Sequence, residues 1–368
     1  MGVRVALGAV AGTVGGPATY AVELLRALAR AFPDDEYTVL SDRPEFFPDA
    51  AARVHLPLRS TWYQPYWDHV ALARALAKGN FDLYHGTKGV LPRRLRIPAV
   101  VTVHDLAHRV VPETFSRAQR CHLGLETAPT LRRAGAVITD SQHSAADLRR
   151  LFPAASAKVE SIPLGVPAWA RKATTVEVES WMSARGLRGP CIGYLGTVQP
   201  RKNLDVLAQA FTKAAAGRPW RLLVAGRLRP GYRPACLEGG DSRITYLGVL
   251  PQDELPAFLG AVACMVSPSS YEGFGLSLLE AMACGCPVVG LNNSSVPEVV
   301  GDAGILVEQR GGNGLSDRLA AAIVKIVSRD DEARRLSAAG LQRASRFSWD
   351  KTARLTRAVY ARCVEGKT

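Results

Sequence analysis

The sequence has little that is typical of a membrane-spanning, disulfide-linked or zinc-binding protein. Within its 368 residues, no apolar run approaches the roughly 18 to 20 residues that span a bilayer, and the first residues lack a signal-peptide cleavage pattern. The seven cysteines form no CxxC pair, lie at no zinc-finger spacing with histidine, and are odd in number. We therefore expect a cytoplasmic protein whose thiols stay reduced.

Several motifs of common enzyme classes are also missing. There is no HExxH, GxSxG or Walker GxxxxGK[ST] motif, which removes several hydrolase and kinase classes. Gly8, Gly12 and Gly15 come close to a dinucleotide fingerprint, but they are spaced by four and three residues instead of as GxGxxG. A dehydrogenase is therefore disfavoured.

The positive charge is not gathered into a nucleic-acid-binding segment. The net charge of +13 is spread over both halves of the chain, and no long Lys/Arg run with interleaved aromatic residues occurs. We therefore expect no nucleic-acid partner. Attraction to diphosphates and peripheral contact with the anionic inner face of a membrane both remain open.

What the sequence does contain is a regular alternation of strand-like and helical segments. A parallel sheet with crossover helices requires such a pattern, and the strand-like runs of the first half lie at residues 3–10, 37–41, 52–58, 81–86, 99–105 and 136–141. The alternation restarts near residue 191 and continues to residue 308. Because a chain of this length fits two cores, we expect an α/β protein with two Rossmann-like doubly wound domains.

A linker divides the two expected domains. Pro163, Gly165 and Pro167 follow one another closely, as linker residues often do, so residues 1–166 form an N-terminal domain and residues 167–347 a C-terminal domain. A bend at Phe347–Trp349 would return the last helix, about residues 348–368, to the first domain. Since the strand ends of such sheets carry ligands, we expect the two domains to face each other across a binding cleft.

The strongest functional signal is the segment SYEGFGLSLLEAMACGCPVV at residues 270–289. Gly273 and Gly275 let backbone N–H groups approach a ligand, and the helix that begins near Leu276 directs its positive end to the same place, where a phosphate fits. Glu272 and Glu280 can accept hydrogen bonds from the vicinal hydroxyls of a ribose or hexose. Without these glycines, the two carboxylates would be explained as ordinary solvated charges.

A second strand–loop–helix segment, YLGTVQPRKNLDVLAQAF at residues 194–211, has two cations just before its helix. Arg201 and Lys202 can hold a diphosphate and stabilise the negative charge that develops on it as a leaving group. Taken alone, an Arg–Lys pair is more often part of a solvated surface. Together with the segment at residues 270–289, it indicates that two loops converge on phosphate.

The first half offers weaker candidates. Gly15 and Gly16 open a helix after the first strand and can bring the backbone close to a phosphate or sugar. His104 ends the run at residues 99–105, at the edge where a parallel sheet places chemistry, but a histidine there is more often structural than catalytic. His85 and Asp140 end neighbouring runs and show that position alone decides little.

These segments together resemble glycosyltransferase family 4 (GT4), a retaining family with the GT-B fold. The likeness extends over nearly the full chain. It includes the Gly15–Gly16 loop, HDLAHRVVPETF at residues 104–115, the segment 141–148, IPLGV, the GTxxPRKN loop, the E-x7-E motif and the FSW terminus. The HDL and PE residues look most like the mannosyltransferase-B branch, whose members commonly use GDP-mannose or a related GDP-sugar.

The resemblance also implies roles for individual residues. Arg201 and Lys202 would hold the diphosphate, Glu280 the ribose, and Glu272 the donor sugar, while Arg227 and Val249 would lie near the base. Gly16 would close on the phosphate from the other domain, and His104 would lie beside the reacting face of the sugar. The implied catalytic residues are His104, Arg201, Lys202 and Glu272, and the implied donor-binding residues are Gly15, Gly16, Thr197, Arg201, Lys202, Arg227, Val249, Glu272, Gly273, Phe274, Gly275, Leu276 and Glu280.

The implied reaction is transfer of a hexose from a nucleotide sugar to a hydroxyl group by front-face substitution. GDP-mannose is the expected donor, with UDP- and dTDP-sugars as alternatives, and the acceptor is a glycan, a lipid-linked molecule or a natural product. No DxD pair ends a strand in the motif regions, which fits a cation pair in place of a metal, and no cofactor is expected. A nucleotide-sugar 2-epimerase of the same architecture and a non-catalytic sugar-nucleotide-binding protein remain alternatives.

The aromatic segment at residues 61–67 has three open interpretations. Trp62, Tyr63, Tyr66 and Trp67 stack on acceptor sugar rings, insert into a membrane interface, or belong to the core of the first domain.

Overall fold

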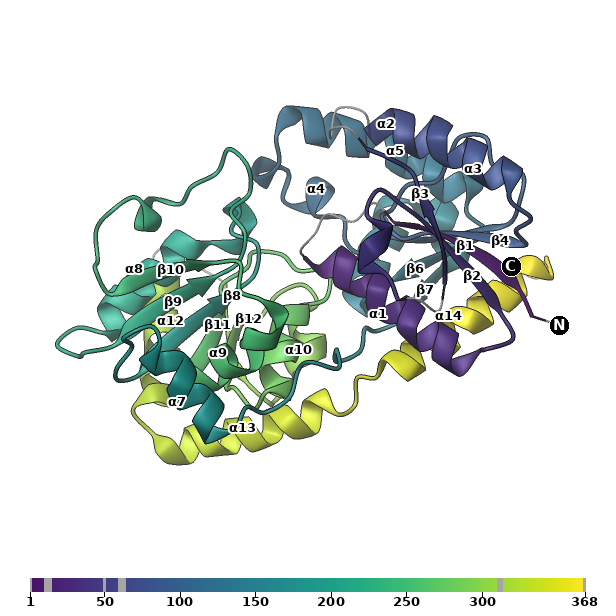
Figure 1. Cartoon of the computed structure of the whole chain (residues 1–368). Coiled ribbons are helices and arrows are strands. Elements are labelled where there is room, and N and C mark those ends of the chain that lie inside the picture. Colours follow the sequence, from purple (N-terminus) through teal and green to yellow (C-terminus); the bar gives the residue numbers. More distant parts are fainter. Residues whose placement is uncertain (1, 10–14, 49–50, 59–63, 310–313, 367–368) are drawn as a thin grey trace. The chain divides into compact units, whose positions relative to one another are not determined.

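The computed structural model describes residues 2–9, 15–48, 51–58, 64–309 and 314–366, and the chain divides into two compact units (Figure 1). Unit 1 contains Met1–Gly165 and Ser348–Thr368, and unit 2 contains Val166–Phe347. Each unit is described by itself below.

Unit 1 is built on a parallel sheet. In its described part, seven strands pair in the order β3-β2-β1-β4-β5-β6-β7, and every pairing is parallel. The order reverses between β1 and β4, which is the point where a doubly wound sheet opens a ligand-binding crevice. The strands are β1 (Arg4–Ala9), β2 (Glu36–Ser41), β3 (Ala52–His55), β4 (Leu83–Gly86), β5 (Ala99–Thr102), β6 (Ala136–Thr139) and β7 (Val159–Ser161).

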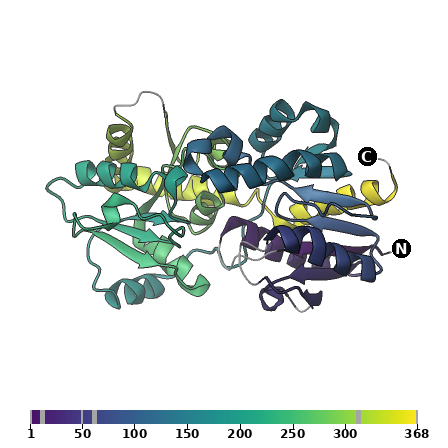
Figure 2. The same cartoon turned by 90° about the horizontal axis from the view of Figure 1, so that it is seen from above.

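Helices lie on both faces of this sheet (Figures 1 and 2). The first crossover helix, α1, buries one apolar face with Leu24, Leu25 and Leu28, as its 3.6-residue periodicity predicts. The helices of unit 1 are α1 (Gly16–Ala31), α2 (Gln64–Tyr66), α3 (Leu72–Lys78), α4 (Ala107–Val110), α5 (Arg117–Arg133), α6 (Gln142–Leu151) and α14 (Trp349–Val364).

The last helix, α14, packs into unit 1 against α1. It begins after Phe347, and the Ser348 side chain caps its first turn by accepting from the Asp350 N–H at 3.2 Å. Thr352 donates to the Pro163 carbonyl at 2.7 Å, and the buried Tyr360 hydroxyl lies 2.7 Å from Nδ1 of His85. The end of the chain thereby completes the core of the unit that contains its beginning.

Unit 2 repeats the same architecture. Its described residues form a six-stranded parallel sheet in the order β10-β9-β8-β11-β12-β13, with the reversal between β8 and β11. The strands are β8 (Cys191–Leu195), β9 (Arg221–Ala225), β10 (Ile244–Gly248), β11 (Val262–Ser267), β12 (Val288–Leu291) and β13 (Ile305–Val307). The prediction of two doubly wound α/β sheets is therefore confirmed.

The helices of unit 2 pack in pairs. Apolar side chains of α8 and α12 form one buried cluster with the sheet, while α7 packs on α9 and α10 packs on α13. The helices are α7 (Thr175–Ser183), α8 (Leu204–Ala214), α9 (Leu255–Ala261), α10 (Leu276–Ala283), α11 (Val296–Val300), α12 (Leu315–Val327) and α13 (Asp330–Ala344). Among the helices of the described segments, none is both long and apolar enough to cross a membrane.

Regular structure resumes soon after Pro167, because Thr174 and Glu177 form a reciprocal capping box that starts α7.

Candidate functional site

Three charged side chains meet at the point where the strand order of unit 2 reverses. Arg201 and Lys202 lie in a short 3-10 turn after β8, and Glu272 lies in the loop after β11. Lys202 Nζ donates to Glu272 Oε1, and Arg201 Nη1 donates to Glu272 Oε2 at 3.2 Å. Arg201 Nη1 also donates to the Tyr271 carbonyl at 2.5 Å. The structure therefore brings these three predicted site residues together, and we call them the charge triad.

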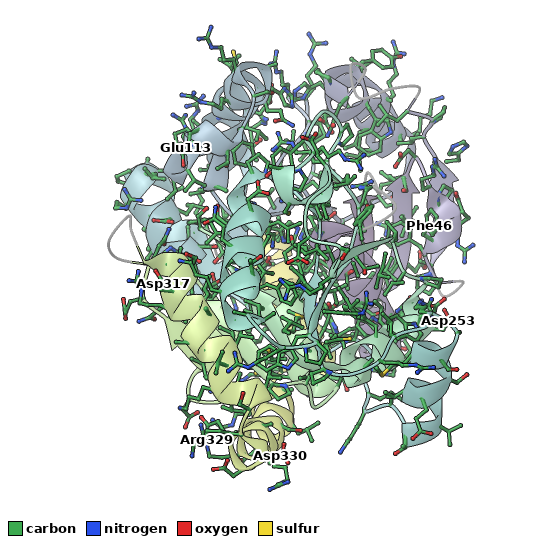
Figure 3. All side chains as sticks on the ribbon, turned by 90° about the vertical axis from the view of Figure 1, so that its left-hand side faces the viewer. Phe46, Glu113, Asp253, Asp317, Arg329 and Asp330 are labelled. Carbon is green, nitrogen blue, oxygen red and sulfur yellow. The ribbon has the colours of Figure 1, made fainter. Side chains whose placement is uncertain are left out.

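The charge triad is withdrawn from solvent, unlike most charged groups of the chain. Asp317, Arg329 and Asp330 are exposed on the surface of unit 2 (Figure 3), whereas Glu272 is only 6% exposed. Burial raises the pKa of Glu272, but the charges of Lys202 and Arg201 outweigh it and lower the pKa to about 2. Glu272 is therefore a carboxylate at any physiological pH, and it lies between two cations of a kind that also binds anions.

Backbone contacts hold the two loops of the charge triad in register. Asn203, in a left-handed conformation with φ of 49°, caps the start of α8 and donates through its amide to the Pro268 carbonyl at 3.0 Å. The Ser270 N–H donates to the Arg201 carbonyl at 2.9 Å, and the Glu272 N–H donates to Ser294 Oγ at 2.9 Å. The side chains of the charge triad therefore rest on a hydrogen-bonded scaffold, which reduces the reorganisation needed when a ligand binds.

The glycine-rich loop leads directly from Glu272 into α10. Gly275 adopts φ of 96° at the start of this helix, a conformation that side-chain-bearing residues rarely take. Its neighbour Phe274 is buried and packs edge-on against Phe347, with ring centroids 5.8 Å apart. Gly273 and Leu276 flank these residues, so the first N–H groups of α10 lie beside the charge triad in sequence and carry the positive end of the helix dipole.

Glu280 lies on α10 and is 9% exposed. Its charge raises the pKa of the nearby Cys284 thiol, in addition to burial. It is therefore not a solvated helix-surface charge.

The other predicted donor residues of unit 2 lie just beyond three neighbouring strands. Gly196 and Gly226 directly follow β8 and β9, and Gly248 ends β10. All three have positive φ, and a Cβ on Gly226 would lie 1.9 Å from the Gly196 carbonyl oxygen. Thr197, Arg227 and Val249 come directly after these glycines. The Thr197 carbonyl accepts from Tyr194 at 3.1 Å, Arg227 is exposed and Val249 is 48% exposed.

In unit 1, His104 follows β5 and is held by both ring nitrogens. Nδ1 lies 2.7 Å from Asp140 Oδ2 at the end of β6, and Nε2 lies 3.0 Å from the Thr87 carbonyl after β4. A carbonyl and a carboxylate only accept, so this arrangement favours a proton on each ring nitrogen. Burial lowers the pKa of His104, but Asp140 outweighs it and raises the pKa above its ordinary value. Asp140 therefore stabilises the cationic form of His104.

A second buried histidine adjoins His104 and has the opposite character. His85 Nε2 lies 2.8 Å from Thr102 Oγ1, which is also 2.8 Å from the hydroxyl of Tyr20. Burial, with a smaller contribution from cationic His104, lowers the pKa of His85 to about 3. The ring of Tyr20 stands edge-on to that of His104 at 4.9 Å. His85, Thr102 and Tyr20 thus form a network of uncharged side chains, and the Tyr20 ring of this network packs against His104.

Sequence reasoning missed the role of Asp140. It was noted only as an acidic residue that ends a strand, yet it is the charged partner of His104. The positions of His104 and Asp140 after successive strand-like runs could have indicated this contact, because residues that follow adjacent parallel strands meet at one sheet edge.

Gly15 and Gly16 begin α1 at the end of the sheet that holds His104. Gly15 has φ of 124°, and its carbonyl accepts from Ala18 and Thr19 at 3.0 and 3.2 Å. Among the residues that the structure describes, a Cβ added to Gly16 would meet no heavy atom within 4 Å, so none of these neighbours requires a glycine there.

Only part of the aromatic segment lies within the described residues. Trp62 and Tyr63 lie outside the described residues, as does Gly12. Trp67 is buried and donates through Nε1 to the Leu56 carbonyl at 2.8 Å, so this residue belongs to the core and does not stack on a ligand. Tyr66 is 53% exposed.

Comparisons with known proteins agree with this arrangement. Residues 14–168 match the family model "Glycosyltransferase Family 4", and residues 189–329 match "Glycosyl transferases group 1". The O-antigen chain mannosyltransferase B of Escherichia coli is 31% identical over 283 residues, which are 73% of this chain and 71% of that protein.

Solved structures share the fold at low sequence identity. The glycosyltransferase WaaG of lipopolysaccharide biosynthesis superposes with a TM-score of 0.79 and 15% identity over 97% of this chain and 99% of its own. Anabaena HepE, solved with UDP and glucose, has a TM-score of 0.76 and 18% identity over 98% and 99% of the two chains.

Proposed function

This chain belongs to glycosyltransferase family 4 and has the GT-B type of fold, and from that premise we propose that it transfers a hexose from a nucleoside diphosphate sugar to a hydroxyl group with retention of configuration. That it is a glycosyltransferase follows from the family. The donor, the stereochemistry and the acceptor are our proposal, and the charge triad is the observation that carries it.

The charge triad supplies what a diphosphate leaving group needs. Arg201 and Lys202 offer several donors from one loop, and the N–H groups at the start of α10 add the positive end of a helix dipole. Within the protein, the Glu272 carboxylate compensates the charges of both cations. A bound diphosphate would take over part of these contacts, and the Glu272 carboxylate would then be available to the hydroxyls of the donor sugar.

The proposed chemistry is front-face substitution. The bond between the anomeric carbon and the phosphate oxygen breaks while the acceptor oxygen bonds to the same face of that carbon. The acceptor proton passes to the departing phosphate oxygen, so no protein base is required. This assignment suits His104, which donates from both nitrogens and would act on the donor sugar by its position and positive charge.

We propose GDP-mannose as the donor, because the chain is 31% identical over 73% of its length to an O-antigen mannosyltransferase. The complex of HepE with UDP and glucose makes a UDP-sugar the competing donor. A thermal-shift screen of GDP, UDP, dTDP and ADP separates these, since a ligand at 100 times its Kd adds about 2.7 kcal/mol of stability. Stabilisation by UDP but not by GDP would overturn the choice of donor.

The remaining donor contacts follow from the strand ends. We propose that Arg227 and Val249 lie near the base, Glu280 binds the ribose hydroxyls, Thr197 and residues 273–276 line the donor, and Gly15 and Gly16 approach the phosphate from unit 1. The N-terminal unit would bind the acceptor, which is a glycan, a lipid-linked molecule or a small natural product. No nucleic acid and no cofactor are part of this proposal, and the protein would work in the cytoplasm or on the inner face of a membrane.

The reaction itself is tested by product analysis. Incubation with donor and a panel of acceptors should give a product whose anomeric configuration, measured by NMR, matches that of the donor. Conversion of the donor sugar to its 2-epimer without acceptor would instead identify an epimerase. Loss of transfer in excess EDTA would contradict the use of a cation pair in place of a metal.

A further inference from the structure

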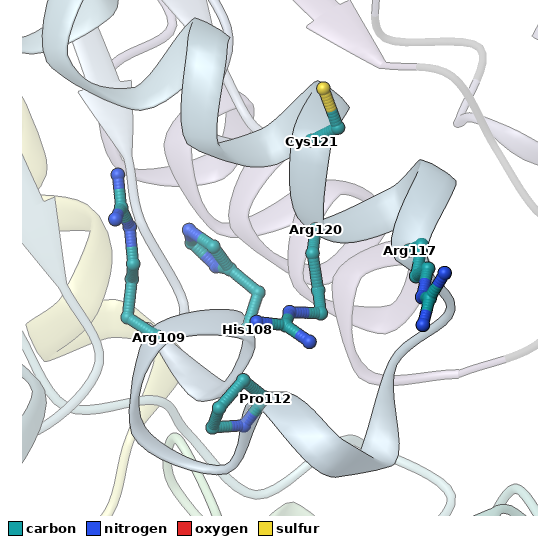
Figure 4. Close-up of a pocket in the computed structure, with 6 residues that line it drawn as sticks. All are labelled: His108, Arg109, Pro112, Arg117, Arg120 and Cys121. Carbon is teal, nitrogen blue, oxygen red and sulfur yellow. The ribbon is translucent and has the colours of Figure 1, made fainter.

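A pocket of about 550 Å³ lies in unit 1 between α4 and α5, away from the residues assigned to the donor. It is lined by His108, Arg109, Pro112, Arg117, Arg120 and Cys121 (Figure 4). In the figure, Arg120 extends from α5 toward α4 and Pro112. Three guanidinium groups and an imidazole therefore surround one hollow, and no acidic side chain is among the residues that line it.

In the described part of the chain, no acidic side chain forms an ion pair with the arginines of this basic pocket. Across the described segments of the chain, neither Arg117 nor Arg120 forms an ion pair, although many other arginines do. Arg109 makes a long, exposed contact of 3.5 Å to the Gly124 carbonyl, and its guanidinium lies over the ring of Phe152 at 5.9 Å from the centroid. Arg117 and Arg120 are exposed, and His108 is 8% exposed.

The position of two of these arginines opposes local helix stability. Ser116 and Gln119 form a capping box that starts α5 at Arg117, so Arg117 and Arg120 stand in and next to the first turn. Positive charge is unfavourable at this end of a helix, where the dipole is itself positive, and the first turn of α5 has no acidic residue to compensate. An anion bound here would satisfy both the arginines and the dipole.

The basic pocket follows the strand that ends in the predicted catalytic histidine. α4 begins three residues after His104, and Asp105 Oδ1 fixes its start by accepting from the Ala107 N–H at 2.9 Å. The pocket is therefore built by the loop that leaves the same sheet edge as His104. If unit 1 binds the acceptor, as the proposed function has it, an acceptor group can occupy this pocket.

We propose that the basic pocket binds a phosphate group carried by the acceptor. This inference rests on the proposed function and names the chemical class of its acceptor. The volume lies within the range of about 300 to 1,000 Å³ typical of small-molecule sites, so it has room for more than the phosphate alone. Guanidinium groups bind phosphate through paired, charge-assisted hydrogen bonds. A concave hollow suits a discrete phosphate better than the flat surface of a membrane.

The test uses Cys121 as a reporter in the full-length protein. Cys121 is exposed, Cys236 is half-buried and the other five cysteines are buried, so a fluorinated alkylating reagent labels Cys121 in preference. Inorganic phosphate and mannose 6-phosphate should shift the fluorine resonance of Cys121 in a saturable manner, whereas mannose should not.

Matched variants locate the effect. Arg117→Ala combined with Arg120→Ala should weaken the apparent Kd for mannose 6-phosphate at least tenfold. Arg94→Ala combined with Arg96→Ala removes the same charge from other exposed positions of unit 1 and should leave the Kd unchanged. Arg201→Ala, in the donor site, should also leave it unchanged. A resonance that no phosphate shifts, or an equal response in both double variants, would overturn the proposal.

Two further measurements are needed. One distinguishes a membrane phosphate from an acceptor phosphate, and the other distinguishes failure of the phosphate pocket from failure of the proposed function. Vesicles of phosphatidylcholine with one fifth phosphatidylglycerol test a membrane headgroup as the source, and a response to the vesicles alone would reject an acceptor phosphate. The reporter requires no catalysis, so saturable phosphate binding without sugar transfer would reject the proposed function and leave the pocket intact. Sugar transfer without a phosphate response would reject the phosphate pocket and leave the proposed function intact.

Discussion

The two units place a carboxylate and a cation at the same edge of similar sheets, but they fix the charge in different ways. In unit 2, Glu272 lies between two cations that stay protonated over the whole physiological range, and its pKa is lowered to about 2. In unit 1, Asp140 pairs with His104, whose cationic form depends on a raised but titratable pKa. The comparison indicates that the charges of the triad in unit 2 stay fixed at physiological pH, while the charge of His104 in unit 1 can titrate.

The largest expected effect comes from removing a cation in unit 2. Arg201→Ala or Lys202→Ala should lower kcat by about 100- to 1,000-fold, or about 2.7 to 4 kcal/mol of barrier, if each stabilises the departing diphosphate like an oxyanion-hole donor. Steady-state kinetics at saturating donor measure this.

Two controls accompany the cation variants. Lys213→Ala removes an exposed lysine paired with Asp317 and should change kcat little. Because each cation variant leaves Glu272 with a single cationic partner, thermal unfolding should be followed in parallel. Unchanged turnover in both well-folded variants would show that the cation pair does not act on the leaving group.

The second effect concerns stability and acts through Glu272. Its folded pKa of about 2 lies below its ordinary value near 4.5, so its pairing stabilises the fold above pH 4.5. That stability is lost as the pH falls toward 2. It amounts to at most about 3 kcal/mol.

Urea unfolding from pH 7 to pH 3 checks the contribution of Glu272. The free energy of unfolding should fall more steeply with acid in the wild type than in Glu272→Gln. Glu254→Gln, which alters a half-exposed pair with Arg185 in the same unit, should follow the wild type. Parallel pH curves for wild type and Glu272→Gln would mean that the two cations do not hold the carboxylate.

A smaller effect is expected in unit 1, where the charge titrates. Asp140→Asn removes the main cause of the raised pKa of His104, so burial should then bring this pKa below its ordinary value near 6.5. In the wild type, the pairing stabilises the fold below pH 6.5 and is lost as the pH rises through the folded pKa of His104.

NMR titration of the His104 ring, assigned with His104→Gln, measures this pKa directly. The transfer rate of Asp140→Asn should begin to fall at lower pH than that of the wild type. If the pKa of His104 is the same in Asp140→Asn as in the wild type, Asp140 does not stabilise a cation in unit 1 as Glu272 does in unit 2.

Sequence patterns predicted the strands well and the contacts between them poorly. The apolar run at residues 99–105 becomes β5 only from Ala99 to Thr102, since the polar residues that follow turn out of the sheet toward the site. Arg201 and Glu272 were both identified by their loops, but they are 71 positions apart and meet only because β8 and β11 are neighbours. Asp140 was missed for the same reason. Its contact with His104 exists only because β6 pairs with β5, and the sequence does not show which strands pair.

Helix starts explain the other misses. Ser141 caps α6 by accepting from the Ser144 N–H at 3.0 Å, and Ser144 donates to the His104 carbonyl. No helix start was predicted at Arg117, where Ser116 and Gln119 form the capping box that begins α5. Without that start, the arginines of the basic pocket could not be recognised as a group.

The smallest expected effect on stability separates a glycine needed by the fold from one needed by a ligand. Because a Cβ on Gly16 would meet nothing within 4 Å, Gly16→Ala should leave the fold intact and stabilise α1 by up to about 1 kcal/mol. If Gly16 approaches the donor phosphate, the added methyl group should still weaken donor binding about tenfold. Gly240→Ala, at another open glycine in unit 2, should alter neither property. Calorimetric titration with the nucleoside diphosphate decides the point, since an unchanged Kd in Gly16→Ala would remove unit 1 from phosphate binding and leave that task to the fixed charges of unit 2.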